Sequence, residues 1–338
     1  MKILLSACLS ILCAFSSFSQ GVEKDVIAKR IKSIDTYNSE EFVVSVSDIT
    51  LFKDHIVMLD EKLGKVIVAN KELTDMKIFG VKGGGPEEFL SPYLLINDKE
   101  ENTLYVYDNQ KFKIWPIDID ERAVGKGFPF KSMLFNQTVA LEDGMLYFTS
   151  VSSPAVDVLK YRLKDRKQLG GIDLHKGSVK SFLGRFIFSS NGRFVVVSPY
   201  DGLVIDTYDE NWELLNTEDL TSLPIIAKRL NIKQPSGLSI SGGGKEKIKV
   251  TSGKSTMSSA RLYGNDLYLL VYSRDKDLKS RANVLLKYTY ENGQWQPSRR
   301  ILLPQEGSYK TFAMLLETDQ LVAFDRENGT IDLFEIKG

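Results

Sequence analysis

The sequence predicts an all-β fold, a six-bladed β-propeller built from four-stranded antiparallel blades. From about residue 41 onward, apolar residues recur with a period of two and turn residues separate the runs, as in β-strands. Pairs of such runs recur six times, and the equivalent positions Leu104, Leu146 and Phe194 are 42 and 48 residues apart. A strand repeat of about 40 to 50 residues is the signature of propeller blades.

Each repeat contains a pair of strands joined by a polar turn. The six pairs are 55–60 with 65–69, 104–108 with 112–115, 145–149 with 155–161, 193–197 with 203–208, 266–272 with 283–288, and 320–325 with 330–335. Another strand precedes each pair and in most repeats a fourth follows, which makes a blade of strands A to D from the axis outward. The sixth repeat lacks a fourth strand, and a ring must close or expose two sheet edges. We therefore expect the N-terminal strand 41–46 to complete the last blade.

The chain divides into a signal, a lead-in and the propeller. Residues 1–19 have a basic start, an apolar run and small residues before a cleavage point after Ser19, as in a secretory signal peptide. Residues 20–40 are a polar lead-in with partly helical spacing, and 41–338 form the propeller. An insertion at about 217–258 lengthens the spacing between the fourth and fifth repeats, and proline in its first turn predicts a short helix from Pro224.

Composition excludes several classes of function. The 338 residues include 44 Lys+Arg and 44 Asp+Glu, so no global charge favours nucleic acid as a partner. No internal apolar run is long enough for a transmembrane segment in the mature chain. Both cysteines, Cys8 and Cys13, lie in the signal, so cleavage leaves no thiol for zinc, nucleophilic or redox chemistry.

These features predict an exported protein, in the periplasm, on the cell surface or outside the cell. The alternative is a lipoprotein anchored through Cys8, because Leu5 to Cys8 spells a bacterial lipobox. We disfavour it because a lipidated cysteine should end the apolar run, and this run continues beyond Cys8.

The two faces of the predicted ring differ in sequence. The A–B and C–D turns lie on one face, where the A–B turns are short and of ordinary composition. The other face carries the B–C turns and the D–A connections between blades. That second face holds the glycine-rich connection 80–89, the insertion and the long loop 273–281. Since function concentrates on loops carried by a rigid scaffold, we expect ligands to bind there. The candidate binding residues are Asp60, Lys82, Glu87, Asp108, Asp201, Arg274 and Asp325. The alternative is that these connections merely tolerate insertions.

The repeated aspartates have two interpretations, which the sequence leaves open. An aspartate at the end of a strand can accept hydrogen bonds from the backbone of the following turn. A ring of carboxylates near the axis could instead bind calcium through oxygen ligands. Apart from that calcium ion we expect no cofactor: Gly83–Gly85 lacks the spacing and the Lys-Ser/Thr end of a nucleotide-binding P-loop.

Motifs for catalysis are missing from the sequence. It has no G-x-S-x-G, and its only histidines are His55 and His175, so we assign no catalytic residue.

The segment Gly80-x-x-Gly83-x-Gly85-Pro86-x-Glu88-Phe89, followed by Leu104–Asp108, resembles a known family. It is similar to the G-x-x-G-x-G-P-x-E-F connection and strand of six-bladed propellers in the NHL and TolB-like group, especially secreted propellers abundant in Bacteroidota. Later repeats lack the G-P-x-E-F signature. The resemblance implies a secreted protein with a binding or interaction role, and it transfers no catalytic residues. Some related propellers are calcium-dependent lactonases or amidating lyases, but we find no matching set of ligands in this sequence.

We therefore expect an exported, non-catalytic and monomeric propeller that binds a protein, peptide or glycan through its B–C and inter-blade loops. The alternative is a calcium-dependent hydrolase or lyase that uses channel carboxylates among Asp60, Asp108 and Asp325. A third hypothesis is a purely structural surface protein.

Overall fold

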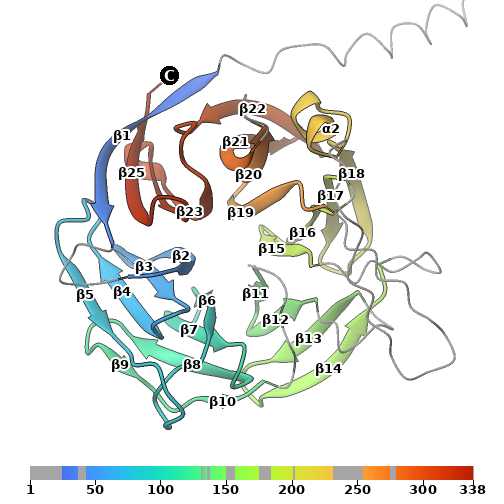
Figure 1. Cartoon of the computed structure of the whole chain (residues 1–338). Coiled ribbons are helices and arrows are strands. Elements are labelled where there is room, and N and C mark those ends of the chain that lie inside the picture. Colours follow the sequence, from blue (N-terminus) through green and yellow to red (C-terminus); the bar gives the residue numbers. More distant parts are fainter. Residues whose placement is uncertain are drawn as a thin grey trace, which may run out of the picture.

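The computed structural model describes residues 25–36, 43–130, 132, 134, 138–149, 157–174, 184–200, 202–230, 254–274 and 279–337. Its antiparallel sheets stand around a central axis like the blades of a propeller, and one strand of each blade faces that axis (Figure 1). The predicted all-β propeller with four-stranded antiparallel blades is thereby confirmed. The predicted signal peptide, 1–19, lies outside the described residues.

Four blades are separate sheets in which the innermost strand comes first along the chain (Figure 1). The first contains β2 (Val46–Phe52), β3 (His55–Asp60), β4 (Lys65–Ala69) and β5 (Met76–Phe79). The second contains β6 (Pro92–Asp98), β7 (Thr103–Asp108) and β8 (Lys113–Asp118), with the short strands β9 (Ala123–Val124) and β10 (Phe128–Pro129) both pairing with β8. The third contains β11 (Ala140–Glu142), β12 (Met145–Phe148), β13 (Val158–Arg162) and β14 (Lys167–Ile172). The fourth contains β15 (Phe186–Ser190), β16 (Arg193–Ser198), β17 (Val204–Asp209) and β18 (Leu214–Asp219).

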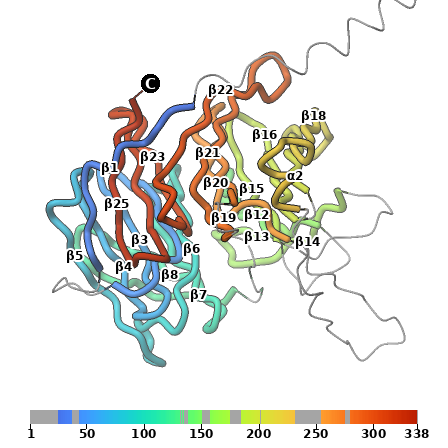
Figure 2. Tube along the Cα trace, turned by 45° about the horizontal axis from the view of Figure 1, so that its top comes forward, coloured from blue at the N-terminus to red at the C-terminus, as the bar shows by residue number. Residues whose placement is uncertain are grey.

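The rest of the ring is one eight-stranded sheet, in the order β19-β20-β21-β22-β1-β25-β24-β23. Its strands are β19 (Met257–Tyr263), β20 (Asp266–Arg274), β21 (Ser280–Glu291), β22 (Gln294–Leu302), β23 (Tyr309–Leu315), β24 (Gln320–Asp325), β25 (Thr330–Ile336) and β1 (Val26–Asp35). The turn η2 (Leu316–Thr318) joins β23 to β24. Helix α2 (Pro224–Leu230) forms where proline predicted a short helix, and it lies in the outer part of the ring beside β18 (Figure 2).

The strand that completes the last blade differs from the predicted one. β1 pairs antiparallel with β25 from Ala28 to Asp35, whereas Val43–Ser45 is not a strand and Val46 begins β2. The prediction that 41–46 closes the ring is therefore wrong, as is partial helicity in 26–35.

The side-chain pattern of β1 explains this error. The face of β1 that begins with the buried Val26 and Ala28 continues with Arg30 and Lys32. Arg30 pairs with the buried Asp332 at 3.2 Å, and Lys32 donates to the carbonyl of Leu73 at 2.7 Å. Charged residues in the inward positions hide the period of two, and the exposed Ile27 and Ile31 give the segment helical spacing instead.

The hydrophobic core lies between neighbouring blades. Between the first two blades, side chains of β3 and β4 pack against those of β7 and β8 in one buried cluster. Phe89, from the connection between these blades, is fully buried in that cluster with its ring edge-on to Trp115 at 5.9 Å between centroids. The connection is thus anchored by its last residue.

The glycine-rich connection is filled by its own acidic side chain. The backbone amide of Gly85 donates to Glu88 Oε2 at 2.6 Å, and a β-carbon built on Gly83 would meet this same oxygen at 2.1 Å. Lys111 Nζ donates to the carbonyls of Gly85 and Glu88 at 2.7 and 2.6 Å. The glycines therefore make room for an internal carboxylate, in a loop whose composition suggests a phosphate cradle.

Candidate functional site

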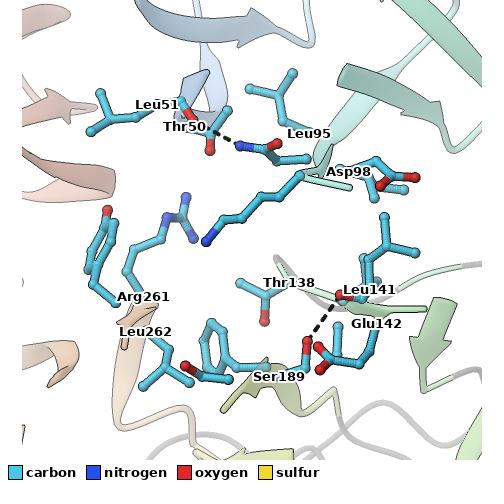
Figure 3. Close-up of a pocket in the computed structure, with 18 of the residues that line it drawn as sticks. Thr50, Leu51, Leu95, Asp98, Thr138, Leu141, Glu142, Ser189, Arg261 and Leu262 are labelled. Carbon is cyan, nitrogen blue, oxygen red and sulfur yellow. Dashed lines mark hydrogen bonds between the residues drawn. The ribbon is translucent and has the colours of Figure 1, made fainter. Parts of the chain in front are cut away.

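A cavity of about 430 Å³ opens near the ring axis on the face of the A–B turns. It is lined by the last residues of the inner strands β2, β6, β11, β15 and β19 and by the turns that follow β6, β11 and β15. Figure 3 shows side chains from these strands converging on a common space. Because several blades contribute to it, the cavity exists only in the assembled ring.

One wall of the cavity is an ion pair between the inner strands of two blades. Arg261 of β19 donates to Asp48 of β2 at 2.5 Å and to the hydroxyl of Thr311 of β23, the strand between them in the ring, at 2.9 Å. Both charged side chains are largely buried, with 12% and 4% of their surface exposed. Burial raises the pKa of the Asp48 carboxyl, although Arg261 and the amides of Leu95 and Ile49 counteract it. The pair fixes the angular positions of these blades.

Other polar side chains occupy the free edges of the inner strands. Asn97 Nδ2 of β6 donates to the carbonyl of Leu51 of β2 at 3.0 Å, and Ser189 Oγ of β15 donates to the carbonyl of Leu141 of β11 at 3.1 Å (Figure 3). The backbone groups of an edge strand need partners outside the sheet. Side chains of the neighbouring blade supply them here, so these polar residues have a structural role as well as lining the cavity.

Several polar groups of the lining have no hydrogen-bond or ion-pair partner among the described residues. They include the hydroxyl of Thr138, the ammonium of Lys99 and the carboxylate of Glu142. Thr138 is only 8% exposed, and Figure 3 shows its side chain in the cavity between the labelled residues of β6 and β15. A buried hydroxyl without a partner costs free energy that a bound polar ligand would recover.

The chemistry of the lining suits recognition rather than bond cleavage. It offers a cation, carboxylates, hydroxyls and side-chain amides, and the described lining contains no histidine or cysteine. The Ser189 hydroxyl donates to the backbone carbonyl of Leu141 and not to a carboxylate or imidazole. A ligand held here would need several hydrogen-bonding groups and both signs of charge.

Three of the residues predicted to bind ligands hold turns instead. Asp60 accepts from the amides of Val44, Lys62 and Leu63 at 2.6 to 2.9 Å. Asp108 accepts from the amides of Leu90, Ser91, Gln110 and Lys111 at 2.7 to 3.3 Å, and Asp325 from Ser308, Glu327 and Asn328. All three carboxylates are fully buried.

Each of these aspartates connects the B–C turn of its blade to the segment that enters its inner strand. Since their oxygens already accept several amide hydrogens each, the structural interpretation of the strand-end aspartates accounts for all three. Within the described ranges, no group of three or more His, Cys, Asp or Glu residues is placed to hold a metal ion. The calcium hypothesis finds no support in Asp60, Asp108 and Asp325.

The remaining predicted residues are dispersed over the B–C face. Lys82 is exposed and donates to the carbonyl of Lys62 at 2.9 Å, and Glu87 is exposed on the same connection. Arg274 ends β20 and lines a second cavity of about 430 Å³ beside α2. Asp201 lies outside the described residues.

The cavity of Figure 3 lies on the face opposite to the predicted one. Sequence reasoning missed Asp48, Lys99, Thr138, Glu142 and Arg261 as site residues. Lys99 and Glu142 belong to short A–B turns of ordinary composition, which carry no signal of their own. Asp48 and Arg261 could have been noticed, because each is the one charged residue of its inner strand.

Comparisons with known proteins establish the fold. No family model matches the chain, and no curated protein matches its sequence. Among solved structures, a protein of Bacteroides fragilis NCTC 9343 that is named as exported is 13% identical with a TM-score of 0.54, over 93% of this chain and 95% of that one. The WD40 repeats of RRP9 are 10% identical with a TM-score of 0.54, over 93% and 100%. Hydrazine synthase of Kuenenia stuttgartiensis is 11% identical with a TM-score of 0.51, over 87% and 77%.

These identities are low enough that the likeness concerns the propeller architecture alone. Over the described part of the chain, none of the helices is sufficiently long and apolar to span a membrane.

Proposed function

We propose that this protein is an exported, non-catalytic binding module whose ligand sits in the cavity on the A–B face. The ligand class that matches the lining is a small molecule with both an ammonium and a carboxylate group, such as a free amino acid or the end of a short peptide. Lys99 would pair with the carboxylate, Glu142 with the ammonium, and Thr138 would hydrogen bond to either.

The unpartnered polar groups of the cavity carry this proposal. Lys99 comes from the turn after β6, and Thr138 and Glu142 come from the segment around β11 in the next blade. These side chains line one space and bond to no described residue. Natural structures satisfy nearly all buried polar groups, so a buried Thr138 hydroxyl that has no partner among the described residues favours a polar ligand in this cavity.

Two further observations favour binding over catalysis. In the described lining the Ser189 hydroxyl is hydrogen bonded to a carbonyl, whereas acyl transfer from a serine would require a base as its partner. The structural relatives include WD40 repeats and a protein named as exported, and propellers of this kind fit a binding role. Their low identity means that they support the class of function and say nothing of the ligand.

We also propose that the ring has six blades, as in the secreted propellers of the NHL and TolB-like group. The eight-stranded sheet consists of two four-stranded units, β19–β22 and β23–β25 with β1, joined where β1 runs parallel to β22 at Val26 and Ile27. Counting these units as two blades gives six repeats, which agrees with the six strand pairs in the sequence.

The experiment uses the chain without residues 1–19 and measures thermal unfolding and calorimetric titration with free amino acids, di- and tripeptides and neutral sugars. We expect at least one amino acid or peptide to bind, and Lys99→Gln and Glu142→Gln each to weaken it at least 10-fold. Matched controls are Lys126→Gln and Glu213→Gln, at exposed residues outside the cavity, which should bind as the parent does. If no amino acid or peptide binds, or if both cavity variants bind normally, the proposal is wrong.

The calcium-dependent enzyme remains the alternative, and one titration separates it from the binding module. A ligand that binds only the native state at 100 times its Kd stabilises that state by about 2.7 kcal/mol. A melting shift of that size in millimolar calcium, lost on chelation, would favour the alternative over our proposal.

Export and a monomeric state belong to the same proposal. We expect the protein in the periplasm, on the surface or in the medium. Fractionation of the native host together with light scattering checks both expectations. A cytoplasmic protein would contradict export, and a mass of two or more chains would contradict a monomer.

A further inference from the structure

Four cationic side chains gather on the B–C face, at the opposite end of the ring from the cavity of Figure 3. Arg229 belongs to α2, Lys254 precedes β19, Arg274 ends β20 and Arg326 directly follows β24. The segments that carry them are connections between blades or ends of second strands, so all four open on one face. We call Arg229, Lys254, Arg274 and Arg326 the cationic cluster.

The aromatic ring of Tyr272 lies at the centre of this cluster. The guanidinium carbon of Arg229 is 4.7 Å from the centre of that ring, and that of Arg326 is 6.0 Å from it. Arg229 is fixed further, because its Nε donates to the carbonyl of Ser255 at 3.1 Å and its Nη1 to the Ser280 hydroxyl at 2.5 Å. These contacts orient the guanidinium groups and, among the described residues, add no carboxylate beside them.

None of the four cations forms an ion pair with a carboxylate of the described residues. Two ion pairs lie nearby, Arg281 with Glu327 at 3.1 Å and Lys310 with Glu61 at 2.8 Å. In each pair the carboxylate is already matched by a basic group outside the cationic cluster. Burial lowers the pKa of Arg229, and the charge of the neighbouring Arg326 lowers it further. Burial also lowers the pKa of Lys254, and the charges of Arg229 and Arg274 add to that effect. Like charges that are held together without a counter-charge attract an anion.

Tyrosine hydroxyls extend the same region toward the ring axis. Tyr93 stands at the start of β6 and Tyr200 just beyond β16, both on the B–C side of their blades. Burial raises the pKa of Tyr93 and that of Tyr200. The charge of a Tyr200 phenolate raises the pKa of Tyr93 further, and the charge of a Tyr272 phenolate does so for Tyr200. Tyr93 and Tyr200 are therefore neutral hydrogen-bond donors at physiological pH, and no described residue accepts from their hydroxyls or from that of Tyr272.

We propose that the cationic cluster and the neighbouring tyrosine hydroxyls form a second binding site, for a ligand that presents a phosphate, sulfate or carboxylate group. Guanidinium forks bind such oxyanions through paired N–H donors, and a tyrosine O–H adds a neutral donor. This inference is independent of the proposed A–B cavity, since the two sites share no residue. It also gives Arg274, a candidate from the sequence, a defined partner chemistry.

The test measures thermal unfolding of the chain without residues 1–19 in inorganic phosphate, inorganic sulfate and glutarate, at an ionic strength held constant with sodium chloride. We expect at least one of the three to raise the Tm with a saturable dependence, and the arm that acts most strongly identifies the oxyanion. Arg326→Gln and Arg274→Gln should each weaken this binding at least 5-fold, and the double variant should abolish it. Arg229 is left unchanged because its bonds to Ser255 and Ser280 make a variant there prone to misfold.

The matched control is Arg122→Gln, which removes the same charge from an exposed turn that follows β8, outside the cationic cluster. It should bind the anion within 2-fold of the parent, as should Lys99→Gln and Glu142→Gln from the A–B cavity. The inference is overturned if none of the three anions stabilises the parent up to 20 mM. It is equally overturned if Arg326→Gln, Arg274→Gln and their double variant bind like the control.

Discussion

Replacing Arg261 with methionine removes the cation that faces Asp48 in the wall of the cavity. Asp48 would keep only the amides of Ile49 and Leu95, at 2.9 Å each, as partners for a carboxylate that is almost completely buried. Breaking a buried ion pair by removing one partner costs about 3–5 kcal/mol, because the remaining charge stays desolvated. We expect Arg261→Met to lower the free energy of unfolding by about that amount at pH 7.5.

The pH dependence of this loss identifies its cause. In the parent, burial already raises the pKa of Asp48 above 3.8, and without Arg261 the pKa rises further. A carboxyl whose folded pKa is raised binds more protons in the folded state, so its contribution to stability is fully present below 3.8 and lost as the pH rises through the folded pKa. The deficit of Arg261→Met should therefore shrink on acidification, by at most about 1.4 kcal/mol per pH unit.

Urea unfolding followed by tryptophan fluorescence between pH 5 and pH 8 measures both quantities. The double variant Asp48→Asn with Arg261→Met should recover most of the loss, because replacing both members of a buried pair is often close to neutral. Arg122→Met serves as a control at an exposed position. A loss below about 1 kcal/mol, or a loss that is independent of pH, would refute this account of the pair.

Three further changes test other parts of the structure. Phe89→Ala should lower the free energy of unfolding by about 3 kcal/mol, because it empties a fully buried site against Trp115. A loss below about 0.5 kcal/mol, measured by urea unfolding, would contradict the anchoring role. Asp108→Asn places an amide donor opposite amide donors and should cost about 1–3 kcal/mol, whereas Asp209→Asn, in a more exposed turn, should cost less than half of that by the same assay. Ala28→Asp buries an unpaired carboxylate between β1 and β25 and should release β1, which limited proteolysis would detect as cleavage within 25–36; full protection would argue against β1 as the closing strand.

The regular part of the fold could be predicted from the sequence because strands in this chain bury alternate residues. In β7, for example, Leu104 and Val106 are fully buried between blades, and the polar turn before Phe112 marks where the first strand of the pair ends. The six strand pairs follow from this rule alone. β1 breaks the rule, since its inward positions Arg30 and Lys32 bond to partners that are distant in sequence and therefore invisible to a local pattern.

The candidate site was harder to predict than the fold. Loop length and glycine content direct attention to the B–C face, yet the glycine-rich connection there encloses its own Glu88 carboxylate. The cavity on the other face depends on side chains from different blades that meet only in the closed ring, such as Arg261 and Asp48, which are 213 residues apart. Spacing along the chain cannot reveal such a meeting, although charged residues inside apolar inner strands could have raised the question.

The pairing of β1 with β25 has a consequence for how the chain reaches its native state. Among the described strands β1 comes first and its partner β25 comes last, with Lys29 opposite Glu335 and Asp35 opposite Thr330. During synthesis β1 must wait for its antiparallel partner until nearly the whole chain has emerged, and such distant pairings slow folding and invite aggregation. Since Ala28 lies opposite Ile336 in antiparallel register, a permuted chain that runs from β25 through a short turn into β1 would convert this slowest contact into a local hairpin.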